Sequence, residues 1–203
     1  MKSVTERVYL TDFILACLAY CLFVGSDSIV KYLGSDYSIV QIIFVNSWFA
    51  LIPIVLYTQT LNGWRKLKKA NFTVHFFRAL TMALALFFGY TGFYRLPMVT
   101  MYSIVFLIPL MITIGSVFFL GEVVRWKRFT AILIGFIGAI ISINPFGTEY
   151  NNYIFLALFC PIFASASYLI VRKYGLKENL FSFLIYGKNI NACLYRSFCP
   201  IYF

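Results

Sequence analysis

Charged side chains are scarce in this sequence. Of the 203 residues only 12% are Asp, Glu, Lys or Arg, whereas 62% are hydrophobic. A soluble domain needs roughly a quarter of charged residues to cover its surface, so this composition excludes a soluble protein and requires a surface that faces lipid. The net charge of +10 comes from short basic clusters between apolar runs. This is the arrangement of a membrane protein, and we therefore expect no nucleic-acid partner.

Residues that bind metals or perform catalysis are equally rare. His75 is the only histidine, and the five cysteines form no CxxC or Cys/His pattern, so no metal site is expected. The sequence contains neither a glycine-rich phosphate loop nor a nucleophile–base motif. We expect no cofactor and no enzyme, and we interpret His75 as a structural or interfacial residue.

What the sequence has is long apolar runs. A helix needs roughly 20 apolar residues to cross a hydrocarbon core about 30 Å thick. The candidate spans are residues 13–33, 39–57, 76–94, 98–120, 129–143 and 153–171. The fifth is short and could begin a turn earlier, and a run from Leu180 is interrupted by Lys188, where we expect it to break. The sequence predicts an all-α, polytopic transmembrane helix bundle.

Basic residues alternate from one loop to the next. Lys2 and Arg7 precede the first span, and the loops after the second, fourth and sixth spans are also basic. These loops contain Arg65, Lys66, Lys68 and Lys69; Arg125, Lys127 and Arg128; and Arg172, Lys173 and Lys177. The opposite side carries only Lys31 and Arg95. Because cytoplasmic loops are enriched in Lys and Arg, we expect a multi-pass protein of the bacterial inner membrane with a cytoplasmic N-terminus.

Small residues and prolines indicate how the spans pack. Close approach of helices in lipid depends on small side chains. Such stripes occur in the third span (Thr81, Ala85, Gly89) and the fifth (Ala131, Gly135, Ala139). Pro53, Pro109 and Pro161 fall inside the second, fourth and sixth spans and predict kinks or hinges, of which static kinks are the commoner kind.

The first and sixth spans resemble each other at an offset of 141 residues. Leu15-Ala16 corresponds to Leu156-Ala157, and Ile29-Val30-Lys31 corresponds to Ile170-Val171-Arg172. An odd number of crossings between two copies reverses the second, and such an inverted repeat is typical of transporters with a site between the copies. Chance similarity between two apolar helices is the alternative.

The stretch from residue 76 to residue 145 is similar to one EamA-type half of the drug/metabolite transporter superfamily. Its features are Arg78, "RLP" before the fourth span, Pro109, "FLGEVVRWKR" with Glu122, and the closing "GFIGAIISINP". The resemblance implies a cytoplasmic N-terminus (1–12), a first five-helix repeat (13–145), the start of a second, inverted repeat (150–187) and a divergent tail (188–203). We interpret Glu122 as a loop acid that pairs locally with its basic neighbours.

The segments "SDSIVKYLGSDYS" and "VHFFRALTMALALFFGYTGFYRLP" are most similar to the S-adenosylmethionine uptake carriers of that superfamily. The resemblance implies a secondary carrier of small polar metabolites that works by alternating access, with membrane lipid and a small-molecule substrate as partners. It also implies two complete repeats, and the tail has the character of an out-of-frame sequence. The alternatives are a truncated, inactive remnant and a half-carrier that acts as a homodimer.

Asp27 leads the candidate substrate-binding residues. A carboxylate inside a membrane helix is costly and marks a functional site by default. Lys31 lies four residues on, so Asp27 either pairs with Lys31 or binds a cationic substrate group. Arg78 either binds a substrate carboxylate or extends to lipid headgroups, the reading that we favour.

Polar and aromatic residues of the neighbouring spans complete the candidate site. Asn46 stands where many relatives have an arginine, and it could instead hydrogen-bond across helices. Tyr90 and Tyr102 could line a cavity for a planar group such as adenine, or could be interfacial aromatics, which we favour.

Overall fold

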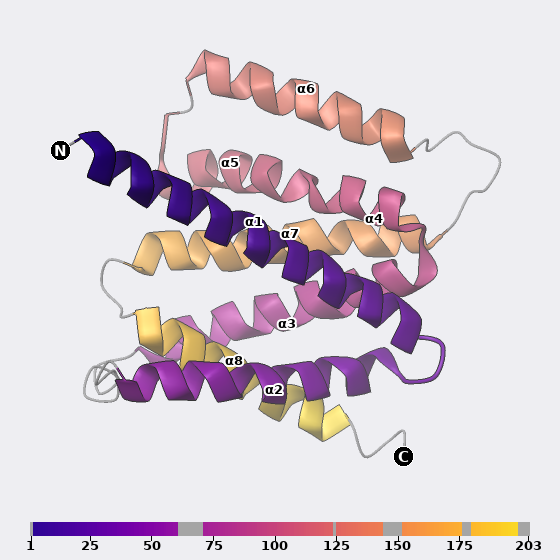
Figure 1. The fold of residues 1–203 in the computed structure, drawn as a ribbon. Helices are drawn as coiled ribbons and strands as arrows, with labels where there is room; N and C mark the ends of the chain where they lie inside the picture. Colours follow the sequence, from indigo (N-terminus) through magenta and orange to yellow (C-terminus); the bar gives the residue numbers. More distant parts are fainter. Residues whose placement is uncertain (1, 61–70, 124, 144–151, 176–179, 199–203) are drawn as a thin grey trace.

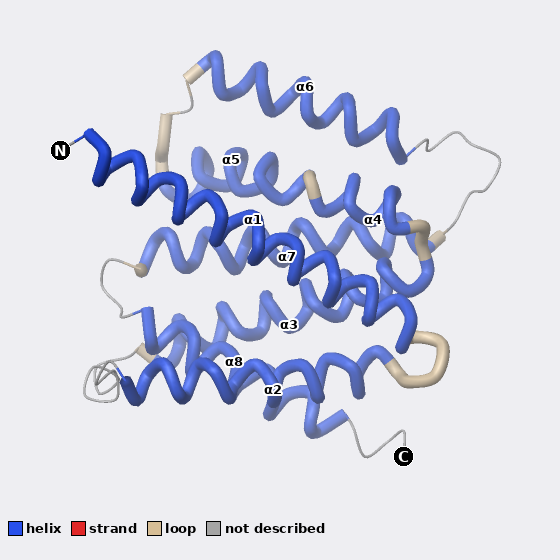
Figure 2. The backbone as a smooth tube through the Cα atoms, viewed as in Figure 1, coloured by secondary structure: helices blue, strands red, loops and turns tan. Residues whose placement is uncertain are grey.

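The computed structural model describes residues 2–60, 71–123, 125–143, 152–175 and 180–198 (Figure 1). Within these ranges all regular structure is helical (Figure 2), which confirms the predicted all-α bundle. The helices are α1 (Lys2–Leu33), α2 (Ile39–Thr60), α3 (Phe72–Arg95), α4 (Met98–Val105), α5 (Leu107–Leu120), α6 (Trp126–Ile143), α7 (Tyr153–Tyr174) and α8 (Leu180–Phe198).

Five segments of the described chain are long and apolar enough to cross a membrane. They are Asp12–Leu33, Ile39–Gln59, Phe72–Arg95, Met98–Leu120 and Tyr153–Tyr174. Large apolar side chains such as Phe13, Phe49 and Phe118 lie exposed on their outer surfaces. Lipid is the solvent that such a surface requires, and the chain is a multi-pass membrane protein.

Helix α3 occupies the centre of the bundle. It contacts α1, α2, α4, α7 and α8, and its most extensive packing is against α7. Its buried face is rich in small residues, namely Ala79, Ala83, Ala85, Gly89 and Gly92. A Cβ added at Gly89 would lie 3.2 Å from Sγ of Cys160 on α7, so these helices approach closely where the sequence predicts a small-residue face.

The fourth span is divided by a break at Phe106. Helix α4 ends at Val105 and α5 begins at Leu107. The ring of Pro109 clashes with the carbonyl of the residue four positions earlier, which is Val105, so the kink predicted from Pro109 is confirmed. Pro53 and Pro161 lie inside helices that continue through them.

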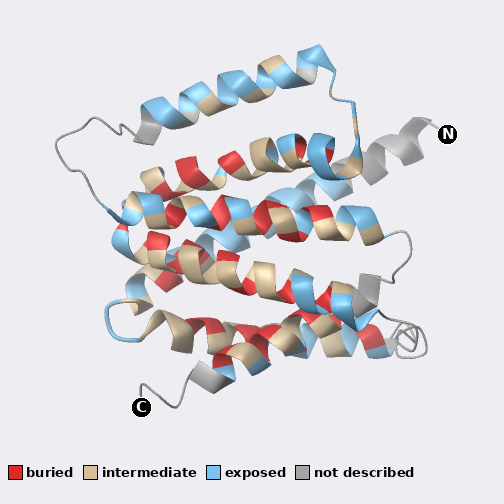
Figure 3. Ribbon diagram, turned by 180° about the vertical axis from the view of Figure 1, so that it is seen from behind, coloured by how far each residue is buried: buried red, intermediate tan, exposed pale blue. Residues whose placement is uncertain are grey.

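Helix α6 lies at the edge of the bundle, and most of its described side chains are exposed (Figures 1 and 3). A cavity of about 600 Å³ lies between it and helices α4 and α5, and Ala131, Gly135 and Gly138 line this cavity. No atom lies within 4 Å of a Cβ built on Gly135 or Gly138. The stripe therefore faces α4 and α5, as predicted, and α6 contacts both of these helices. The packing at Gly135 and Gly138 is loose, because a cavity lies where the small residues leave room.

The expected break at Lys188 is also wrong. Helix α8 continues through Lys188 to Phe198, and it packs against α2 and α3. The hydroxyl of Tyr195 donates a hydrogen bond to the carbonyl of Ala83 on α3. Lys188 is half-buried in this packing, so its charge is held among protein groups and does not end the helix. Residues 199–203 of the predicted tail lie outside the described residues.

The chain direction reverses between the first helices and the last ones. Figure 1 shows α7 running opposite to α1, and α8 running opposite to α2. An inverted repeat requires this reversal. The repeat itself stays a prediction, because it depends on the similarity of the two segments.

We predict that Gly92→Val destabilises the bundle by about 1–3 kcal/mol, the usual cost of overpacking a core. A Cβ at Gly92 would lie 3.2 Å from Cβ of Ala157 and would collide with the buried side chain of Met101. Gly25→Val is the matched control, because a Cβ at Gly25 meets no atom within 4 Å. Equal stability of the two purified variants in a detergent unfolding titration would contradict the central place of α3.

Candidate substrate site

Asp27 is buried in the bundle although it lies on a membrane-crossing helix. Its side chain is 4% exposed, and its Oδ2 accepts a hydrogen bond of 3.0 Å from the hydroxyl of Tyr102 on α4. Phe93 of α3 supports the ring of Tyr102 edge to face, with the centroids 5.2 Å apart. A buried carboxylate is costly unless donors satisfy it, so Tyr102 offsets part of that cost.

Lys31 has a different partner from the one that its spacing suggests. Its Nζ donates a 2.8 Å hydrogen bond to the carbonyl of Leu96, the residue that caps the C-terminus of α3. The carbonyls at a helix C-terminus lack intrahelical partners and carry partial negative charge. The local Asp27–Lys31 pair, one of the two alternatives, is therefore not what the structure contains. Each residue bonds across the bundle.

Asn46 and Tyr90 connect α2 to α3 beside the carboxylate. The Nδ2 of Asn46 donates a 2.7 Å hydrogen bond to the hydroxyl oxygen of Tyr90, and Tyr90 is 8% exposed. Tyr90 belongs to the same buried apolar cluster as Val30 of α1, which lies three positions from Asp27. The structure thus brings together Asp27, Lys31, Asn46, Tyr90 and Tyr102, which we call the carboxylate cluster.

Arg78 lies apart from the carboxylate cluster. It precedes Tyr90 by twelve positions on α3, which corresponds to about 18 Å along a helix. Its Nη1 lies 2.6 Å from the point where a Cβ on Gly187 of α8 would be. The guanidinium therefore packs against α8 inside the bundle, and the favoured expectation that it extends to lipid headgroups is wrong.

Two polar residues of α8 are not among the site residues predicted from the sequence. Lys188 and Asn191 are both drawn into the bundle, and Asn191 is 3% exposed. The available signal was Lys188 itself, because a cation within an apolar run indicates a polar partner inside the bundle as much as it indicates a break.

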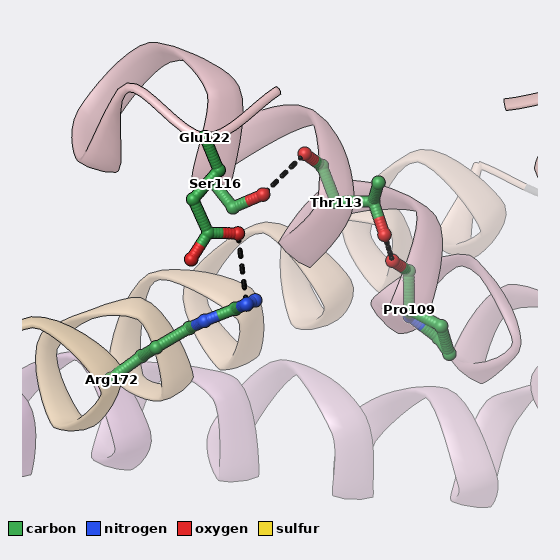
Figure 4. A network of polar contacts seen from close by, with 5 residues as sticks. All are labelled: Pro109, Thr113, Ser116, Glu122 and Arg172. Carbon is green, nitrogen blue, oxygen red and sulfur yellow. Dashed lines mark hydrogen bonds and ion pairs between the residues drawn. The ribbon is translucent and has the colours of Figure 1, made fainter. Parts of the chain in front are cut away.

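Glu122 forms an ion pair with α7 in place of its basic neighbours. Its Oε2 lies 2.8 Å from Nη2 of Arg172 (Figure 4). Gly121 ends α5 in the left-handed conformation, with φ of 68°, and this turn leads the chain to Glu122. The prediction of a local pair is wrong, and Glu122 instead ties the α5–α6 connection to the end of α7.

The carboxylate cluster can attract a cation and bond polar groups around it. An ionised carboxylate has several acceptor positions, and Tyr102 is the donor that the structure places on it. Aromatic faces nearby can also bind a cation or stack on a planar ring. No group of three His, Cys, Asp or Glu side chains that could hold a metal occurs among the described residues.

Membrane-crossing helices around a buried charged group are characteristic of polytopic transport proteins. The chain belongs to the EamA-like transporter family, whose model matches residues 11–144. The matched residues run from α1 to the end of α6.

Individual relatives carry transporter names. The chain is 31% identical to the S-adenosylmethionine uptake transporter of Rickettsia conorii over 92% of this chain and 63% of that protein. It is 24% identical to the riboflavin transporter of Vibrio cholerae, over 79% and 55% of the two chains. It is 21% identical to the pseudopaline exporter CntI of Pseudomonas aeruginosa, over 85% and 61%. The chain thus spans less than two thirds of these relatives, and no solved structure matches it significantly.

We predict that Tyr102→Phe lowers the free energy of unfolding by about 1–3 kcal/mol, because it removes a donor from a buried carboxylate. Tyr32→Phe is the control, since Tyr32 is exposed on the same helix as Asp27. Detergent unfolding of the purified variants measures both values. An equal loss in both would show that the Asp27–Tyr102 bond contributes nothing.

Proposed function

We propose that the chain forms part of a secondary carrier for a small cationic metabolite, and that Asp27 contacts the cationic group of this substrate. The observation that supports this proposal is the buried Asp27 carboxylate, held by Tyr102 between α1 and α4. Charged groups are retained inside membranes chiefly where they contact substrates, ions or protons. S-adenosylmethionine is the substrate that we propose, because relatives that carry its name match most of this chain.

The chemistry of S-adenosylmethionine suits the carboxylate cluster. Its sulfonium and ammonium groups are positive, and Asp27 is the buried anion of the described chain that can meet them. Tyr90 and Tyr102 offer ring faces for the adenine or for the cation. The uncharged Asn46 is already bonded to Tyr90, so it shapes the site through Tyr90.

Movement of the bundle would open this site to each side in turn. The break between α4 and α5 lies only four residues beyond Tyr102. Breaks of this kind supply flexible points in membrane helices. We propose that bending there alters how Tyr102 meets Asp27.

Binding of S-adenosylmethionine to the purified chain tests the carrier proposal. We expect saturable binding by the native chain, weakened at least tenfold by Asp27→Asn, which keeps the shape of the side chain and removes its charge. A tenfold loss corresponds to about 1.4 kcal/mol. Asp36→Asn is the matched control, because Asp36 is exposed in the turn between α1 and α2.

S-adenosylhomocysteine separates the charge from the shape of the ligand. It lacks the sulfonium methyl group, so its sulfur is uncharged and it should bind the native chain more weakly than S-adenosylmethionine does. In Asp27→Asn the affinities for the two ligands should be more nearly equal. Absence of saturable binding by folded protein, or equal affinity of Asp27→Asn and native chain for S-adenosylmethionine, contradicts the proposal.

We also propose that the N-terminus and the basic loops face the cytoplasm of the bacterial cell. The start of α1, the start of α6 and the end of α7 lie at one end of the bundle (Figure 1). The basic residues that belong to or adjoin these segments are Lys2, Arg7, Arg125, Lys127, Arg172 and Lys173. The cluster from Arg65 to Lys69 lies outside the described residues. Cytoplasmic loops of membrane proteins are enriched in Lys and Arg, which supports this orientation.

Cysteine labelling in cells tests this orientation. In a background without native cysteines, Ser35→Cys should react with a membrane-impermeant maleimide in intact cells, because it lies in the α1–α2 turn. Val123 is 94% exposed in the α5–α6 connection, so Val123→Cys is accessible to the reagent. Because we place this connection in the cytoplasm, it should react only after permeabilisation. The reverse pattern would invert the topology.

A further inference from the structure

We propose that the cavity between α6 and helices α4 and α5 binds an acyl chain of an anionic glycerophospholipid, and that the phosphate of this lipid contacts the basic start of α6. The cavity and the start of α6 are together called the α6 lipid site below. No residue of the carboxylate cluster lines the cavity, so the inference does not depend on the proposed function.

The cavity arises where two features of the sequence coincide. On α6, Ala131, Gly135 and Gly138 present almost no side chain toward α4 and α5. On the opposite wall the helix breaks at Phe106, three residues before Pro109. The resulting space of about 600 Å³ is far larger than the voids of a packed interior, few of which exceed a water molecule. It is therefore large enough to hold part of a separate molecule.

The lining of the cavity favours a hydrocarbon. Ser103 is the polar side chain among the lining residues, and its hydroxyl already bonds to the carbonyl of Val99 on its own helix. An apolar cavity does not hold water. Phe106, which is 73% exposed, and the exposed Pro109 both belong to the lining. The cavity thus opens on the lipid-facing surface of the bundle, where acyl chains are the available apolar group.

One face of α6 leads from this cavity to a lysine. Lys127, Ala131, Gly135 and Gly138 are spaced by four, four and three residues, so they form one stripe along the helix. At a rise of 1.5 Å per residue, Lys127 lies about 6 Å from Ala131 and about 16 Å from Gly138 along the axis. A phospholipid has the same order, with its phosphate at the interface and its chains at increasing depth.

The start of α6 carries positive charge that suits a phosphate. Arg125 and Lys127 are exposed, and neither side chain forms an ion pair among the described residues. The first turn of α6 contains no acidic residue, and Glu122 is already paired with Arg172. A helix N-terminus with this composition attracts anions and can bind phosphate through its free N–H groups. An anionic headgroup is therefore favoured over a zwitterionic one.

Native mass spectrometry of the full chain in a neutral detergent tests the site. The two probes are dioleoyl phosphatidylglycerol and dioleoyl phosphatidylcholine, added together at equal concentration. We expect one lipid molecule to stay bound to each chain. Phosphatidylglycerol should be retained at least about fivefold in preference to phosphatidylcholine, because each Lys or Arg near the surface adds attraction for an anionic lipid.

Two variants separate the acyl chain from the headgroup. Gly135→Leu fills the cavity and should abolish retention of both lipids, whereas Gly25→Leu is the matched control outside the cavity, where a Cβ also meets no atom within 4 Å. Lys127→Gln should still retain a lipid but lose the preference for phosphatidylglycerol. Lys173→Gln, at the exposed end of α7, should keep that preference.

Folding of the variants is checked independently. Without added lipid, Gly135→Leu should melt no lower than the native chain, since the new side chain enters open space and leucine favours a helix more than glycine does. Lys127→Gln changes an exposed side chain and decides the headgroup preference by itself. Asp27→Asn should retain the lipid like the native chain, which separates this site from the carrier proposal.

Three results would overturn the inference. They are the absence of retained lipid, equal retention by Gly135→Leu and the native chain, and an unchanged preference in Lys127→Gln. A native chain that flies as a dimer, and becomes a monomer in Gly135→Leu, would also overturn it, because a second copy would then occupy the cavity.

Discussion

The architecture depends on how closely α3 allows other helices to approach. In lipid the hydrophobic effect contributes little to helix association, so close packing and polar bonds must supply the stability. The alanines and glycines of α3 provide that closeness toward α7 and α8, the helices packed most extensively on it. The same helix carries Tyr90 of the carboxylate cluster and Arg78, so both side chains are fixed to one central element.

Few polar bonds of the described residues join different helices. The hydroxyls of Thr58, Ser103, Thr113 and Ser165 bond to carbonyls of their own helices, which removes the cost of burying them and adds no connection between helices. Bonds between different helices are made by Tyr102, Lys31 and Tyr195. Asn46 also bonds Tyr90, and Ser167 of α7 donates to the carbonyl of Arg78 on α3. The mutual orientation of the helices is thus set by a small number of specific contacts.

Features that depend on local sequence were predictable. The apolar spans follow from length and charge, the break before α5 follows from Pro109, and the importance of Asp27 follows from the cost of a buried carboxylate. The partners of these residues were not predictable. The spacing of Asp27 and Lys31 allows a local pair, but Tyr102 is 75 positions away in the chain, and only the assembled bundle decides between the two. The surroundings of Lys188 were not predictable for the same reason. A charge that would break a helix exposed to lipid is tolerated where α8 packs on α2 and α3.

The bond between Tyr195 and Ala83 has a consequence for the order of assembly. The two residues are 112 positions apart, so at a synthesis rate of roughly 5–20 residues per second about 6–22 s pass between them. During that interval α2 and α3 are already made, and the face that α8 later covers has no permanent occupant. The nascent chain is therefore only partly assembled during this interval. Lipid or insertion machinery must cover that face of α2 and α3, and α8 must displace it in order to pack there.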